Sequence, residues 1–155
     1  MKKAIALIIS MLSSSLTEAQ TTNFYTNVTN LWYQGQKTEV LAIGQERLNI
    51  NSNDMAGLLI QWSYDLEFLR LDYVSNSLSR IVQSGASITN TNFKANYPFL
   101  KESMEDMLEF FSTYHPTPTE LAEEQAKGLI SNKTFADFII LEALQKDGLC
   151  EPLTP

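Results

Sequence analysis

A helical pattern of hydrophobic residues between positions 55 and 69 constrains this chain more than any other feature. Large apolar side chains recur every three or four residues, at Met55, Leu58, Leu59, Trp62, Leu66 and Leu69. This spacing is typical of one face of an α-helix. Ile60, Tyr64 and Phe68 form a second apolar edge. A helix that is apolar on two sides needs neighbours on both, so we expect it to lie at the centre of a helical fold.

The rest of the chain also carries helical signals, and none of it has a convincing strand pattern. Further helices are predicted over residues 23–33, 38–50, 71–84, 98–113, 118–130 and 132–146. Residues 86–96 are expected to form a polar loop that separates the first half from residues 97–148. The other connections are short, which favours antiparallel hairpins. The expected fold is all-α, with about seven helices in a stack of hairpins or a compact bundle.

Proline and glycine mark three helix boundaries. Pro116 and Pro118 remove backbone donors, so a helix should end before them. Thr117 and Glu120 have the spacing of a capping box, which predicts that a helix restarts at Pro118. Gly148 is expected to end the last helix, with residues 149–155 as a tail.

The segment from Tyr33 to Asp54 combines a glycine turn, an amphipathic helix and a second polar turn. In the second turn, Asn53 or Asp54 is placed to cap the next helix. Its spacing resembles that of a tetratricopeptide repeat, and the resemblance covers roughly residues 24–85. It is carried by Phe24, Leu31, Gly35, Glu39, Leu41, Leu48, Ile50, Asn53 and Asp54. The sequence departs from the repeat at Val40 and Arg47, which replace small residues, and at Ser52, which replaces a proline. The resemblance implies paired antiparallel helices with a groove that binds a protein or peptide.

Composition limits the class of protein. The chain has 155 residues, of which 44% are hydrophobic, and this suits one domain with a real core. Its formal net charge of −7 disfavours nucleic-acid binding, because phosphate backbones are repelled. Cys150 is the only cysteine, so no intrachain disulfide can form. We expect Cys150 to be accessible, either as a free thiol or in an intermolecular disulfide.

Residues 1–19 have the pattern of a secretory signal peptide. Lys2 and Lys3 precede an apolar run from Ala4 to Leu12, and small or polar residues follow as far as Ala19. The apolar run is shorter than the ~20 residues of a spanning helix. The pattern predicts bacterial export to the periplasm or beyond and no membrane anchor after cleavage, with residues 20–148 as the domain. The alternative is an amphipathic or uncleaved N-terminal helix.

Candidate catalytic residues are sparse. His115 is the only histidine, so a two-histidine metal site and a histidine-activated nucleophile are both disfavoured. Two acidic pairs, Glu105-Asp106 and Glu123-Glu124, lie on charged helical faces where solvation is the ordinary role. The glycines are dispersed and form no phosphate-binding loop. We therefore expect no enzymatic activity, no cofactor and no metal.

The leading hypothesis is an exported helical module that binds a protein or peptide partner. Aromatic side chains carry much of the energy of protein interfaces. The expected contact residues are Trp32, Tyr33, Tyr64 and Phe68. The same spacing also fits core packing, so the sequence leaves the division between core and surface open. The alternative hypothesis is a small ligand-binding or enzyme-neutralising protein of the inhibitor or immunity type.

Overall fold

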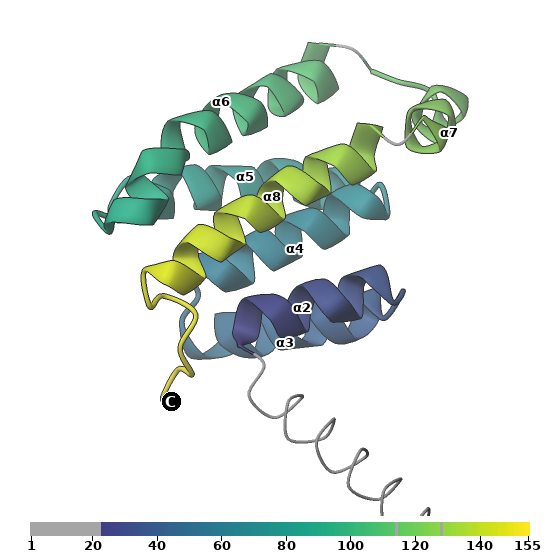
Figure 1. Cartoon of the computed structure of the whole chain (residues 1–155). Coiled ribbons are helices and arrows are strands. Elements are labelled where there is room, and N and C mark those ends of the chain that lie inside the picture. The colour runs from purple at the N-terminus through teal and green to yellow at the C-terminus, as the bar shows by residue number, and fades with distance from the viewer. Residues whose placement is uncertain (1–22, 114, 128) are drawn as a thin grey trace, which may run out of the picture.

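The computed structural model describes residues 23–113, 115–127 and 129–155, and within these ranges the chain is all-α with seven helices and no strand (Figure 1). The expected fold class is confirmed. The helices are α2 (Phe24–Tyr33), α3 (Lys37–Ile50), α4 (Met55–Glu67), α5 (Leu71–Gly85), α6 (Thr91–Thr113), α7 (Pro118–Ala126) and α8 (Leu129–Lys146). The predicted signal peptide lies outside the described residues. No described helix combines the length and hydropathy needed to cross a membrane.

Helix α4 lies at the centre of the fold, as its two apolar edges predict. It packs against α3, α5 and α8, and Leu58, Ile60 and Leu66 are almost completely buried. Helix α8 crosses the bundle beside α4 and also contacts α2, α6 and α7 (Figure 1). These contacts join segments far apart in sequence, whereas the units of a repeat array contact only their neighbours. Of the two expected arrangements, the contacts favour the compact bundle.

The start of α6 differs from the expected polar loop over residues 86–96. The helix begins at Thr91, and Pro98 lies inside it rather than at its first position. The cause is a carboxylate from the end of α8. Asp147 accepts hydrogen bonds from the backbone N–H groups of Asn92 at 3.0 Å and Phe93 at 2.7 Å. Backbone N–H groups in the first turn of a helix have no acceptor within that helix. Asp147 supplies the acceptors and therefore caps α6 from a distant part of the chain.

The boundaries near α7 were predicted with mixed success. Thr117 and Glu120 form the expected capping box, with Pro118 at the start of α7. However, α7 ends at Ala126 rather than near residue 130, and α8 begins at Leu129 rather than at residues 132–134. Gly148 follows α8 with a positive φ of 74°, as expected of a helix-ending glycine.

Helices α3 and α4 approach closely where two glycines face the partner helix. A Cβ atom on Gly44 would lie 2.6 Å from Ile60 Cγ2, and one on Gly57 would lie 2.8 Å from Leu48 Cγ. Real Cβ atoms essentially never come this close to another heavy atom. In the tetratricopeptide repeat, the small residues that allow two helices to approach lie at other positions, one of which is occupied by Val40 in this chain. Gly44 and Gly57 provide the close approach instead.

Candidate functional site

The four aromatic residues expected at a partner surface divide between the core and the surface. Trp32 is 4% exposed and packs edge-on against Phe138, with ring centroids 5.4 Å apart. It is therefore a core residue in this fold and is not available to a partner at the surface. Tyr33 is 65% exposed and Phe68 is 50% exposed, while Tyr64 is half-buried. Three of the four predicted contact residues thus remain available to a partner.

Two helix turns bring these residues to one end of the bundle. Tyr33 lies at the α2–α3 turn and Phe68 at the α4–α5 turn, and both turns lie at the same end (Figure 1). An ion pair of 2.6 Å between Lys37 Nζ and Glu67 Oε1 joins them. The side chain of Gln125, from α7, donates to the backbone carbonyl of Glu67 at 3.2 Å. This end is consequently fixed by contacts among α3, α4 and α7.

Arg70 lies between an aromatic ring of α4 and one of α5. Its guanidinium carbon lies 4.3 Å from the ring centroid of Tyr73 and 6.0 Å from that of Tyr64. Tyr64 stacks on Phe68 at 4.6 Å between centroids, and Tyr73 is 53% exposed. We call the surface formed by Tyr33, Tyr64, Phe68, Arg70 and Tyr73 the aromatic end. Sequence reasoning missed Tyr73, although an aromatic residue on the polar face of a helix was a usable signal.

Arg70 follows a strained turn between α4 and α5. Three helices end with a residue in the left-handed backbone region, and at two of them this residue is a glycine, Gly35 or Gly148. At the third it is Leu69, with φ of 54°. A side chain in this region costs roughly 1–2 kcal/mol. The turn is closed by the backbone N–H of Arg70, which donates to the carbonyl of Asp65 at 2.7 Å.

Asp65 is a buried carboxylate beneath the aromatic end. Its side chain accepts from Gln61 Nε2 at 3.1 Å, lies 3.5 Å from Ser77 Oγ and pairs with Arg70 at 3.3 Å. Burial raises the pKa of Asp65, because a low-dielectric surrounding disfavours the charged form. The hydrogen bond from Gln61, the charge of Arg70 and the hydrogen bond from Ser77 oppose this shift. The net rise means that the charged form of Asp65 is less favourable in the folded chain than in the unfolded chain, although the carboxylate orients Arg70.

Replacing Asp65 with asparagine is expected to keep the free energy of unfolding at pH 7 unchanged or raise it by about 1 kcal/mol. Asparagine keeps an oxygen for Gln61 and Ser77 but carries no charge. The folded-state pKa of Asp65 exceeds its unfolded value of 3.8, so the folded chain binds this proton more tightly. The penalty for the charge therefore sets in as the pH rises above 3.8 and is complete above the folded pKa. Urea unfolding should show a larger benefit of the substitution at pH 7 than near pH 4.

The matched control is Asp106→Asn, which neutralises an exposed acid on α6. It should change the free energy of unfolding by less than about 0.5 kcal/mol at both pH values. A loss of more than about 1 kcal/mol for Asp65→Asn at pH 7 would show instead that the pair with Arg70 outweighs desolvation.

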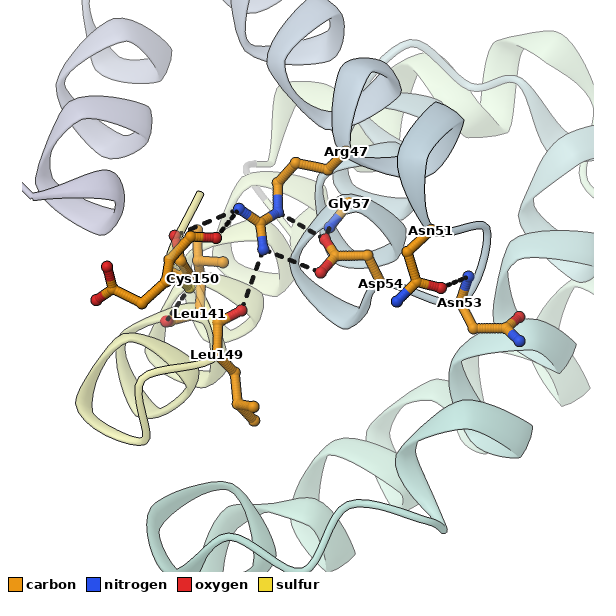
Figure 2. A network of polar contacts seen from close by, with 9 residues as sticks. Arg47, Asn51, Asn53, Asp54, Gly57, Leu141, Leu149 and Cys150 are labelled. Carbon is orange, nitrogen blue, oxygen red and sulfur yellow. Dashed lines mark hydrogen bonds and ion pairs between the residues drawn. The ribbon is translucent and has the colours of Figure 1, made fainter. Parts of the chain in front are cut away.

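The opposite end of the bundle is held by Arg47, which is only 6% exposed (Figure 2). Its Nε and Nη2 atoms donate to the two carboxylate oxygens of Asp54 at 2.7 and 3.0 Å. Nη1 donates to the carbonyls of Cys150 and Glu151, and Nη2 also donates to the carbonyl of Leu149. Every N–H of the guanidinium thus has an acceptor. We call Arg47, Asp54 and residues 149–151 the C-terminal clasp.

The clasp joins several helices at once. Asp54 also caps α4, because it accepts from the backbone N–H of Gly57 at 2.8 Å, while the guanidinium of Arg47 lies 4.9 Å from the ring centroid of Phe24 in α2. The cap at Asp54 was among the expected ones. Arg47 appeared in the sequence only as a large residue where the repeat has a small one. A lone basic residue on the buried side of a helix was the signal that could have identified it.

Cys150 is buried, which corrects the expectation that it is accessible. It is 3% exposed, and its Sγ lies 3.9 Å from the carbonyl oxygen of Leu141. Burial raises the pKa of the thiol to about 12, although the nearby charge of Arg47 opposes the shift. Only the thiolate reacts readily, so the folded chain protects Cys150 from alkylation and from an intermolecular disulfide.

The residues considered for catalysis lie on the surface. His115, Glu105, Asp106 and Glu123 are exposed, and Glu124 pairs with Lys127 at 3.2 Å. No group of three or more potential ligands that could hold a metal occurs among the residues that the structure describes. A scan of protein-family models and searches of curated proteins and of solved structures found no match to this chain.

Proposed function

We propose that this chain is an exported, non-catalytic binding module that holds a protein or peptide partner at the aromatic end. The observation that carries the proposal is the exposure of Tyr33, Phe68 and Tyr73, each at least 50% exposed, at one end of the bundle, where the guanidinium of Arg70 lies against Tyr73. Tyrosine, phenylalanine and arginine are enriched at protein interfaces, and arginine and tyrosine are prominent among the residues that dominate binding energy.

The contacts beneath this surface support the proposal. The Lys37–Glu67 ion pair fixes the two turns relative to each other, and Asp65 orients Arg70 from below. A surface that is already ordered loses less conformational entropy when a partner binds. The retention of a buried carboxylate and a strained Leu69 at this turn is also consistent with function, because both features are unfavourable for stability.

The test is capture of partners from the native exported fraction, followed by quantitative mass spectrometry. The double variant Phe68→Ser/Tyr73→Ser should lower recovery of a recurrent protein partner at least ~10-fold, since truncation of a residue that dominates binding costs about 2 kcal/mol or more, and about 1.4 kcal/mol is a factor of ten in affinity. Both side chains are at least half exposed, so the free energy of unfolding should change little.

The matched control is Phe99→Ser, which removes a 62% exposed aromatic ring from α6. This variant should recover the partner as well as the unaltered chain does. Equal recovery by all three proteins would remove the aromatic end as the binding surface. If Phe99→Ser lowered recovery of the partner as much as the double variant does, capture would be due to nonspecific hydrophobic adhesion.

A further inference from the structure

A cavity of about 390 Å³ lies at the end of the bundle that carries the C-terminal clasp. The start of α2, the second half of α3, the end of α8 and the segment after it line this open cavity. Its apolar wall includes Phe24, Ile43, Ile50 and Leu153. Sites for small molecules commonly have volumes of about 300–1,000 Å³ and mostly apolar walls with a few polar groups. This cavity has the size and the lining of such a site, and the aromatic end lies at the other end of the bundle.

The charged groups that a ligand in this cavity can reach are acidic. Glu46 and Glu151 line it, and both residues are exposed to solvent. The one cationic residue in the lining is Arg47, and its guanidinium is already committed to Asp54 and to backbone carbonyls. The carboxylates of Glu46 and Glu151 therefore dominate the charge that a ligand meets. Such a site attracts a cation and repels an anion.

We infer that this cavity binds a small cationic amphiphile, with its apolar body against Phe24, Ile43 and Ile50 and its ammonium group between Glu46 and Glu151. The apolar body removes side chains such as Ile50, which is 37% exposed, from water. The ammonium group supplies the charge complementarity that a neutral or anionic amphiphile lacks. This site goes beyond the proposed partner surface and is independent of it.

The clasp forms part of this site. Residues 150–153 line the cavity, and Arg47 holds the backbone of residues 149–151 against α3. The cavity wall consequently depends on the C-terminal segment staying docked. The sequence suggested only a tail here, because the atoms of this segment that accept from Arg47 are backbone carbonyls, which carry no sequence signal.

The experiment is isothermal titration calorimetry of the full chain at pH 7 with n-octylammonium, compared with n-octyl sulfate, both below their micellar concentrations. Octylammonium should bind with a sub-millimolar dissociation constant and at least ~10-fold more tightly than octyl sulfate. Glu46→Gln/Glu151→Gln should weaken octylammonium binding by about 10-fold. Phe68→Ser/Tyr73→Ser, at the aromatic end, should leave it unchanged.

A matched control separates a specific site from general attraction to an acidic chain of net charge −7. Glu102→Gln/Asp106→Asn removes the same charge from the exposed face of α6 and should bind octylammonium like the unaltered chain. Equal weakening by the two double variants would overturn the proposal. So would the absence of octylammonium binding, or equal affinity for octyl sulfate.

Discussion

Replacing Arg47 with methionine is expected to lower the free energy of unfolding by about 3–5 kcal/mol. The substitution keeps an apolar stem but leaves the carboxylate of Asp54 buried without its charge partner. Three backbone carbonyls of the C-terminal segment also lose their donor. Domains of this kind are stable by only about 5–15 kcal/mol, so urea denaturation should show a large shift of the midpoint.

Cys150 gives this prediction a second readout. Its thiol has a pKa of about 12 when the C-terminal segment is docked. If loss of Arg47 undocks the segment, the pKa falls toward the ordinary 9.0 and alkylation at pH 8 accelerates by up to about three orders of magnitude. Alkylation rates measured under native conditions then report whether the C-terminal segment is docked, separately from global unfolding.

Two controls make the Arg47 result specific. Lys101→Met breaks an exposed pair with Glu105 and should cost less than about 1 kcal/mol. Arg47→Met/Asp54→Asn removes both buried charges while asparagine retains the helix cap, so it should cost less than the sum of the two single variants. A loss below about 1 kcal/mol for Arg47→Met would mean that the clasp does not stabilise the fold.

Replacing Gly57 with alanine is expected to lower the free energy of unfolding by about 1–3 kcal/mol. Within an ordinary helix this change gains roughly 1 kcal/mol, because alanine is the better helix former. Here the new Cβ would lie 2.8 Å from Leu48 Cγ and 3.0 Å from the carbonyl oxygen of Gly44. The backbone of α3 cannot yield as a flexible side chain can, so the two helices must separate.

Thermal or urea unfolding of a double-mutant cycle tests this close approach. Leu48→Ala removes the nearest side-chain atoms, so Gly57→Ala should cost less in that background than in the unaltered chain. An increase in stability for Gly57→Ala alone would show that α3 and α4 do not pack as closely at this position.

Local sequence patterns predicted the helices because the signals that form them are local. The apolar edges of α4, the capping box at Thr117 and the cap at Asp54 each involve residues within a few positions of one another. The start of α6 could not be found in this way. Its capping carboxylate is Asp147, which is 55 residues away from Asn92.

The candidate sites were predicted less completely, for the same physical reason. Aromatic spacing identified Tyr33, Tyr64 and Phe68, but a periodic pattern does not say whether a neighbouring helix covers a side chain. Only the packing of Phe138 against Trp32 removed Trp32 from the surface.

By itself, the sequence determined the all-α class, most helix boundaries and the central place of α4, because hydrophobic periodicity and capping act over one or two turns. The tertiary structure alone decided that α8 closes the bundle, that Arg47 clasps the C-terminal segment and that Cys150 is buried. These features depend on contacts between residues far apart in the sequence, such as Arg47 and Glu151, which are 104 positions apart. Such contacts form only when the whole chain buries its apolar surface together.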